Sequence, residues 1–134
     1  MQKVFLIGTS YDSMYHVEKK YNKRCHFFPE MNIGNKKKWE IFVNENISGS
    51  LYISIDKDVL SSNYAVTGWD HGKMDLYEIK EYLSDIYSKG NVLGVDICGD
   101  VMKSEKVSEL MRVQKIDQMT NIFLIKTISD ILFQ

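Results

Sequence analysis

The sequence contains little proline or cysteine, no excess of one charge and no long apolar run. Its 134 residues include one proline and two cysteines, and the formal net charge is −1. Two cysteines are too few for a disulfide framework, and a nucleic-acid partner would select a basic surface. No stretch approaches the roughly 20 apolar residues of a membrane span, and the N-terminal apolar run stops at Gly8. We therefore expect a soluble, cytoplasmic protein that binds neither nucleic acid nor membrane.

The composition is that of an ordinary globular protein, with 44% hydrophobic and 26% charged residues. A chain of this length suits a single domain, and we expect one domain over residues 1–134. Cys25 and Cys98 both lie in apolar runs, so we expect them to be reduced core residues.

Apolar runs alternate with segments of helical periodicity along the whole chain. The runs at residues 3–7, 25–28, 51–55 and 92–98 have the length of strands, and the last two are apolar enough to be covered on both faces. Helical periodicity marks residues 14–21, 37–47, 76–87 and 114–133, with Asp75 as an N-cap and Gly90 as a stop for the third. This alternation predicts a three-layer α/β/α sandwich with a short, mainly parallel sheet.

The last predicted helix, residues 114–133, is long and amphipathic. We expect its apolar residues to face the core, namely Ile116, Met119, Ile122, Phe123, Ile125, Ile128 and Leu132.

Four aspartates follow or end the third and fourth predicted strands. Asp56 and Asp58 come after the third strand, and Asp96 and Asp100 belong to the end of the fourth. Reactive groups of parallel sheets gather beyond the carboxyl ends of the strands. If the two strands are neighbours, all four carboxylates share one rim of the sheet.

The segment Asp56-Lys57-Asp58 places two carboxylates on one side of an extended chain and Lys57 on the other. Such pairs bind hard cations such as Mn²⁺ or Mg²⁺. The competing interpretation is an N-cap followed by a solvated turn. Burial of the preceding strand, including Ser54, would favour the metal interpretation.

The loop Trp69-Asp70-His71-Gly72 carries a second group of candidates. His71 titrates near neutrality and, with Asp70, is a candidate ligand or general base, although a plain exposed loop has the same composition. Asp96 stands inside an apolar run, where it either adds a donor to the site or bonds to backbone amides.

In order, the motifs S-I-D-K-D-V-L, T-G-W-D-H-G, a helix and G-V-D-I-C are similar to the C-terminal half of the arginase–deacetylase (ureohydrolase) superfamily. The resemblance covers about residues 51–99 and is nearest to an arginase-like group whose loop reads W-D-x-G. It implies that Asp56 and Asp58 match two ligands of a two-metal, usually Mn²⁺, centre. There, a metal-bridging hydroxide attacks a planar carbon–nitrogen group.

We accordingly assign Asp56 and Asp58 as metal ligands and Asp70 and His71 as catalytic candidates. The candidates for substrate binding are Trp69, Asp96 and Asp100.

The chain departs from the superfamily pattern in three places. The G-G-D-H and D-x-H-x-D motifs, which supply the other metal ligands, do not occur in these 134 residues. Gly99 stands where the family has a substrate-recognising glutamate, and Ser61-Ser62 replaces an Asp-Pro.

We therefore expect an arginase-like metallohydrolase fragment or subunit that binds Mn²⁺ weakly. A second polypeptide or a second copy would complete the site for hydrolysis of a C–N bond. The alternative is a non-catalytic α/β binding or assembly module. A receiver- or flavodoxin-like domain is disfavoured because Gly8-Thr9-Ser10 follows the first strand in place of an acidic cluster.

Overall fold

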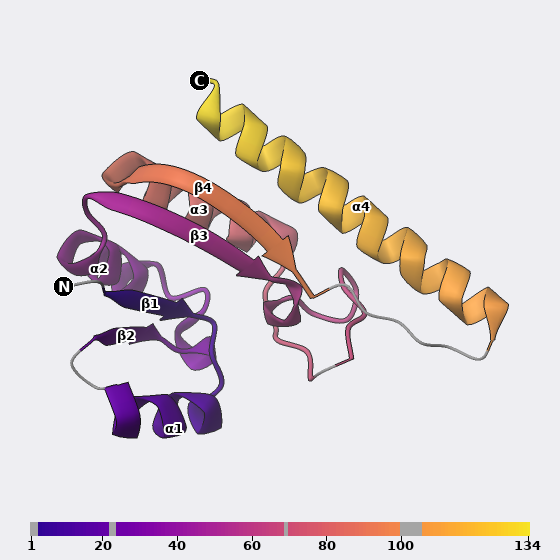
Figure 1. Cartoon of the computed structure of the whole chain (residues 1–134), viewed down its shortest axis with the longest axis horizontal. Helices are drawn as coiled ribbons and strands as arrows, with labels where there is room; N and C mark the ends of the chain where they lie inside the picture. Colours follow the sequence, from indigo (N-terminus) through magenta and orange to yellow (C-terminus); the bar gives the residue numbers. More distant parts are fainter. Residues whose placement is uncertain (1–2, 22–23, 69, 100–105) are drawn as a thin grey trace. The chain divides into compact units, whose positions relative to one another are not determined.

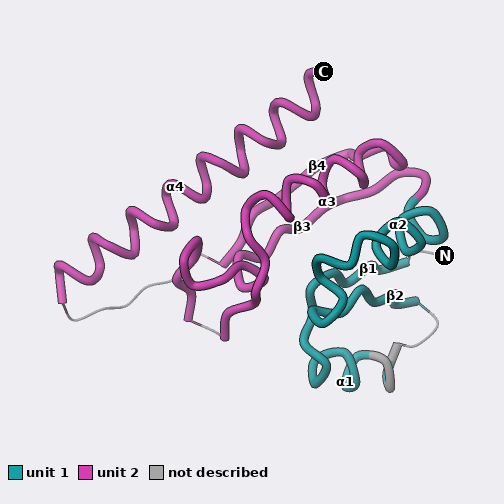
Figure 2. Tube along the Cα trace, turned by 180° about the vertical axis from the view of Figure 1, so that it is seen from behind, with its two compact units in different colours: residues 1–47 teal, residues 48–134 magenta. Residues whose placement is uncertain are grey.

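The computed structural model describes residues 3–21, 24–68, 70–99 and 106–134. Within these residues the chain is mixed α/β, with four α-helices and two parallel two-stranded sheets (Figure 1). It divides into two compact units, residues 1–47 and 48–134, coloured separately in Figure 2. The single domain expected over the whole chain stays a prediction.

The first unit is one βαβ segment followed by a helix. Strands β1 (Val4–Ile7) and β2 (Cys25–Phe28) pair in parallel and are joined through α1 (Tyr11–Tyr21). A short 3₁₀ turn, η1 (Glu30–Asn32), leads to α2 (Lys36–Asn46), which Asn35 caps by accepting a hydrogen bond from Lys38 N. The buried core is aromatic and aliphatic, made of Phe28, Trp39, Phe42, Val43 and Ile47.

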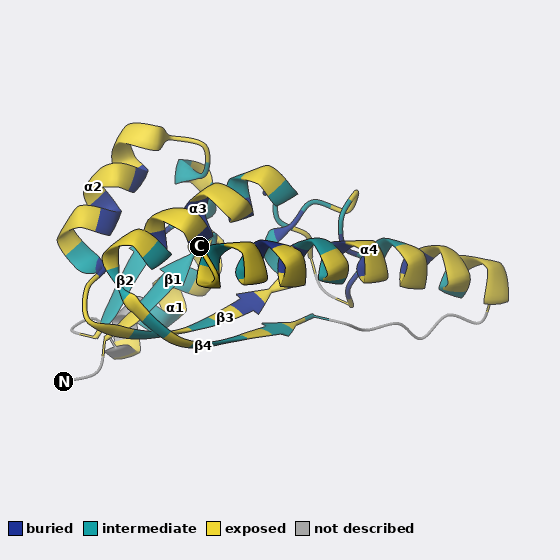
Figure 3. Cartoon of the chain, turned by 90° about the horizontal axis from the view of Figure 1, so that it is seen from above, coloured by how far each residue is buried: buried dark blue, intermediate teal, exposed yellow. Residues whose placement is uncertain are grey.

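The second unit is a longer βαβ segment with an additional helix. Strands β3 (Ser50–Asp56) and β4 (Asn91–Cys98) pair in parallel, and the connection runs through η2 (Lys57–Val59) and α3 (Leu76–Lys89). In Figure 3, α3 and the long α4 (Val107–Leu132) lie on the same side of the strand pair. The two helices meet at Tyr77 and Phe123, whose ring centroids are 6.1 Å apart.

Helix α3 begins at the predicted N-cap. Asp75 Oδ1 accepts hydrogen bonds from Tyr77 N and Glu78 N, each 2.8 Å long, and Asp75 N donates to Glu78 Oε2 at 3.0 Å. This reciprocal capping box satisfies amides that the first helical turn leaves without partners. Such an N-cap contributes about 1 kcal/mol to helix stability. Gly90 ends the helix, as predicted.

All eight elements predicted from periodicity are present, and the α/β class is confirmed. The expectation that β3 and β4 are covered on both faces is wrong, since exposed residues alternate with inward residues along β3. Ser54 and Cys98 both lie on exposed positions, so neither is the core residue that we expected. The apolar residues of β3 and β4 therefore cover only one face of the strand pair.

The expected orientation of the last helix is also wrong. The residues of α4 that are buried are Val113, Asp117, Thr120, Leu124 and Thr127. Four residues expected in the core are instead among the large exposed side chains, namely Met119, Ile122, Ile125 and Leu132. Ile116, Phe123 and Ile128 are half-buried. Three of the five buried residues are polar, so hydropathy alone did not identify the centre of the buried face. No helix of the described segments is long and apolar enough to cross a membrane.

Candidate functional site

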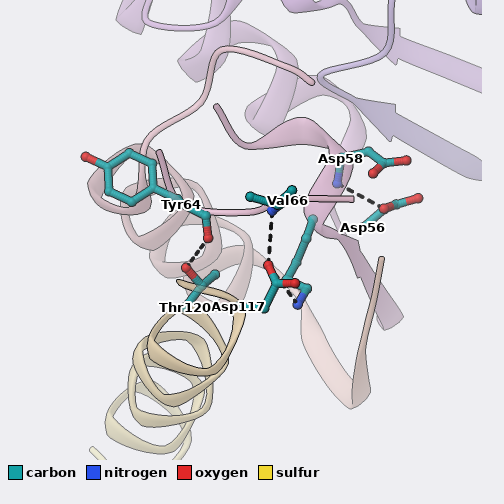
Figure 4. Close-up of polar contacts among 7 residues, drawn as sticks. Asp56, Asp58, Tyr64, Val66, Asp117 and Thr120 are labelled. Carbon is teal, nitrogen blue, oxygen red and sulfur yellow. Dashed lines mark hydrogen bonds and ion pairs between the residues drawn. The ribbon is translucent and has the colours of Figure 1, made fainter. Parts of the chain in front are cut away.

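The end of β3 turns sharply into η2, and Asp56 makes this turn. Asp56 Oδ1 accepts a hydrogen bond from Asp58 N at 3.1 Å, which makes Asp56 the N-cap of η2. Figure 4 shows the carboxyl groups of Asp56 and Asp58 on the same side of the turn, pointing away from Asp117. Two carboxylates on one side agree with the sequence prediction, and the capping role agrees with its competing interpretation.

The carboxyl group of Asp58 has an oxygen without a hydrogen-bond donor. Asp58 Oδ1 is buried and accepts no hydrogen bond from the part of the chain that the structure describes. A buried carboxylate oxygen without a donor is costly, because desolvation is not compensated. A bound cation is one group that would compensate it.

Three backbone hydrogen bonds hold the Asp70–His71 loop against η2. Gly72 N donates to Asp58 O at 2.6 Å, Met74 N to Val59 O at 3.1 Å and Ser61 N to Met74 O at 2.9 Å. A Cβ atom on Gly72 would lie 2.2 Å from Val59 O, so only glycine permits this approach. The loop is therefore fixed beside the Asp58 backbone, with Asp70 and His71 both exposed.

Asp96 is placed on the exposed face of the β3–β4 pair, directly opposite Ser54. Ser54 Oγ donates to Asp96 Oδ1 at 2.7 Å. A hydrogen bond to Asp96, and next its negative charge, raise the pKa of Tyr52 above its usual value. Asp96 therefore accepts hydrogen bonds from the side chains of Ser54 and Tyr52, both on β3. Its role in substrate binding stays a prediction.

Sequence reasoning missed a buried ion pair behind the turn. Lys57 is fully buried, and its Nζ lies 3.9 Å from Asp117 Oδ1 on α4. Asp117 Oδ1 also accepts a hydrogen bond from Val66 N at 3.1 Å, and Thr120 Oγ1 donates to Tyr64 O (Figure 4). The signal in the sequence was the position of Asp117. It lies four residues after Val113 and three before Thr120, and therefore on the same side of α4 as these two buried residues.

The structure brings some of the predicted site residues together and leaves others untested. Asp56, Asp58 and the backbone of the Asp70–His71 loop lie at one end of the β3–β4 pair. Trp69 and Asp100 lie outside the described residues. No group of three His, Cys, Asp or Glu side chains suited to a metal occurs within the described segments.

Two carboxylates fit a hard cation such as Mn²⁺ as partial ligands, because such ions prefer oxygen donors and retain water in open positions. Asp58 Oδ1 is the better donor, since Asp56 Oδ1 already accepts an amide hydrogen bond. Asp56 and Asp58 therefore supply at most half of the ligands of such an ion.

Searches for similar proteins found no family model, no curated protein and no solved structure that matches the chain.

Proposed function

We propose that the end of β3 is half of a divalent-cation site in an arginase-like metallohydrolase, and that a second polypeptide or a second copy supplies the remaining ligands. The buried Asp58 Oδ1 without a donor carries this proposal. The resemblance of residues 51–99 to the ureohydrolase superfamily supports it, because Asp56 and Asp58 match metal ligands there. The completed protein would have the three-layer α/β/α arrangement with one mainly parallel sheet.

When bound, Mn²⁺ acidifies a water molecule and stabilises charge that develops during hydrolysis of a C–N bond. Asp58 would bind the ion, and Asp56 would hold the η2 turn and add a second carboxylate. Gly72 fixes the neighbouring loop through its bond to Asp58 O, and His71, the residue before it, would serve as a base once the shell is complete.

A second candidate is a non-catalytic module that acts by binding or assembly. The observation that favours it is the capping bond of Asp56, which gives one of the two carboxylates a purely structural role. The two candidates differ in one property, namely whether Asp58 binds a cation.

We expect the purified chain to bind Mn²⁺ weakly, and Asp58→Asn to abolish this binding. The substitution keeps the shape of the side chain and removes the charge and one ligand oxygen. The measurement is isothermal titration calorimetry with MnCl₂, in which the affinity of Asp58→Asn should fall by at least about tenfold, to below detection for a site that is already weak. Unfolding by urea should show that Asp58→Asn is no less stable than the parent, because an unsatisfied buried carboxylate has been neutralised.

Asp96→Asn is the matched control, since Asp96 already accepts side-chain hydrogen bonds. It should leave Mn²⁺ affinity within about twofold of the parent value. Equal affinity of the parent and Asp58→Asn would exclude the proposed site and favour the non-catalytic module.

We also expect the chain alone to hydrolyse arginine, agmatine and acetylated amines poorly, even with excess Mn²⁺. A metal held by two carboxylates keeps most of its water, which is then acidified less than in a closed two-metal centre. Assays of urea and acetate release are the measurement. Robust Mn²⁺-dependent turnover that Asp58→Asn removes would contradict the need for a completing partner.

A further inference from the structure

Lys57 is a cation inside the short segment that supplies the two candidate ligands. It stands between Asp56 and Asp58 in the chain, whose carboxyl groups lie on one side of η2 and point away from Asp117 (Figure 4). The Lys57 side chain is fully buried, and its Nζ lies 3.9 Å from Asp117 Oδ1 on α4. Asp58 Oδ1 accepts no hydrogen bond within the described residues, so the Lys57 ammonium does not bond to it. The ammonium is therefore held behind the turn, and Asp58 is left for another cation.

Asp117 offsets the cost of keeping this charge in the interior. A buried ammonium is unfavourable unless an opposite charge compensates it, and a lysine reaches far on its flexible stem. Asp56 and Asp58 are its nearest carboxylates along the chain. We infer that α4 controls the cation affinity of η2: docked α4 withholds the Lys57 ammonium from Asp56 and Asp58, and released α4 frees it to compete with a metal ion for them. This control rests on the proposed function, because it acts on the same two carboxylates.

The contacts of α4 suit a helix that can leave its place. Three of the five residues that α4 buries are polar. Asp117 Oδ1 accepts a hydrogen bond from Val66 N at 3.1 Å, and Thr120 Oγ1 donates to Tyr64 O. Water replaces such hydrogen bonds at small net cost, and segments with few buried apolar contacts open more readily than the rest of a domain.

The backbone of η2 is held by contacts that do not involve α4. Gly72 N donates to Asp58 O at 2.6 Å. On another side, Gly99 approaches so closely that a Cβ atom there would lie 2.9 Å from Asp56 Oδ1 and 3.0 Å from Lys57 N. Release of α4 therefore requires movement of the Lys57 side chain and not of the turn itself.

The position of Lys57 is tested without metal by brief labelling with acetic anhydride and mass spectrometry. In the parent, the buried Lys57 should react at least about tenfold more slowly than the exposed Lys80 and Lys126. In Asp117→Asn the rate at Lys57 should rise by about tenfold or more, because the ammonium loses its anionic partner on α4. Asp130→Asn removes the same charge from an exposed position of α4 and should leave Lys57 protected.

Calorimetric titration with MnCl₂ tests the effect on affinity. Asp117→Asn should bind Mn²⁺ about fivefold or more weakly than the parent, and Asp130→Asn within about twofold of it. Lys57→Met combined with Asp117→Asn should bind at least as tightly as the parent, because the competing charge is gone. An affinity that merely followed the stability of α4 would place this double variant below the parent.

Failure of the inference and failure of the proposed function give different results. Equal Mn²⁺ affinity of the parent and Asp117→Asn, with binding lost in Asp58→Asn, retains the cation site and overturns its control by α4. A parent chain that binds no Mn²⁺ excludes the proposed function and the control with it. Labelling of Lys57 in Asp117→Asn no faster than in the parent overturns the inference whatever the metal titrations show.

Discussion

Replacement of Asp117 by alanine should destabilise the second unit by about 3 kcal/mol or more. Asp117 is mostly buried and is the acceptor for both the Lys57 ammonium and Val66 N. Without it, a fully buried positive charge and a backbone amide each lose this acceptor. Because whole domains are stable by only about 5–15 kcal/mol, the loss should be evident in urea unfolding of the full chain.

Two further variants separate the charge from the hydrogen bond. Asp117→Asn retains an oxygen for Val66 N but removes the negative charge, so its loss should be smaller than that of Asp117→Ala. Lys57→Met combined with Asp117→Asn removes both members of the ion pair and should recover part of the stability. Asp130→Asn, at an exposed position of the same helix, is the control and should change stability by no more than about 0.5 kcal/mol. Equal losses for Asp117→Asn and Asp130→Asn would show that the ion pair contributes nothing.

Replacement of Gly72 by alanine should have an effect of similar size, for a steric reason. Its Cβ would lie 2.2 Å from Val59 O and 2.6 Å from Val59 C, both backbone atoms that cannot rotate away. The loop must then leave η2 and lose the 2.6 Å hydrogen bond from Gly72 N to Asp58 O. Overpacking and the lost hydrogen bond together should cost about 3 kcal/mol.

Gly49→Ala provides the matched comparison in the same unit. Gly49 has a φ of +73° but nothing within 4 Å of the added carbon, so only backbone strain of about 1–2 kcal/mol is expected. Urea unfolding measures both variants, and hydrogen exchange of the Gly72 and Met74 amides locates the change. If Gly72→Ala proves no more destabilising than Gly49→Ala, the close approach of the loop to Val59 is not present in solution.

The elements of the fold were predictable because they depend on local patterns. The N-cap at Asp75 and the stop at Gly90 were readable from residue type alone. The alternation of strands and helices predicted parallel strands but left open whether β3 and β4 are neighbours, which they are. Asp56 and Asp58 lie on one side as predicted, although through the η2 turn and not through an extended chain. The cap and the stop are decided by neighbours within a few residues, whereas the strand pairing joins Ser50–Asp56 to Asn91–Cys98.

What the sequence did not predict depends on distant partners. Asp117 and Thr120 face inward because they bond to the backbone of Val66 and Tyr64, which no hydropathy pattern records. With Asp117 and Thr120 inward, Ile122 and Ile125 lie outward, so only part of the apolar set expected in the core is covered. The exposure of Cys98 likewise reflects the absence of a covering layer on one face of the strand pair, within the described residues, and not a property of its neighbours.

The contacts between α4 and the loop after η2 also have a consequence for synthesis. Val66 and Asp117 are separated by 51 positions and Tyr64 and Thr120 by 56. At about 5–20 residues per second, the ribosome adds Asp117 roughly 3–10 seconds after Val66. During that interval Lys57 has no anionic partner from α4, and the nascent loop remains hydrated. The turn that carries Asp56 and Asp58 should therefore acquire its final surroundings late, after the strand that precedes it has been made.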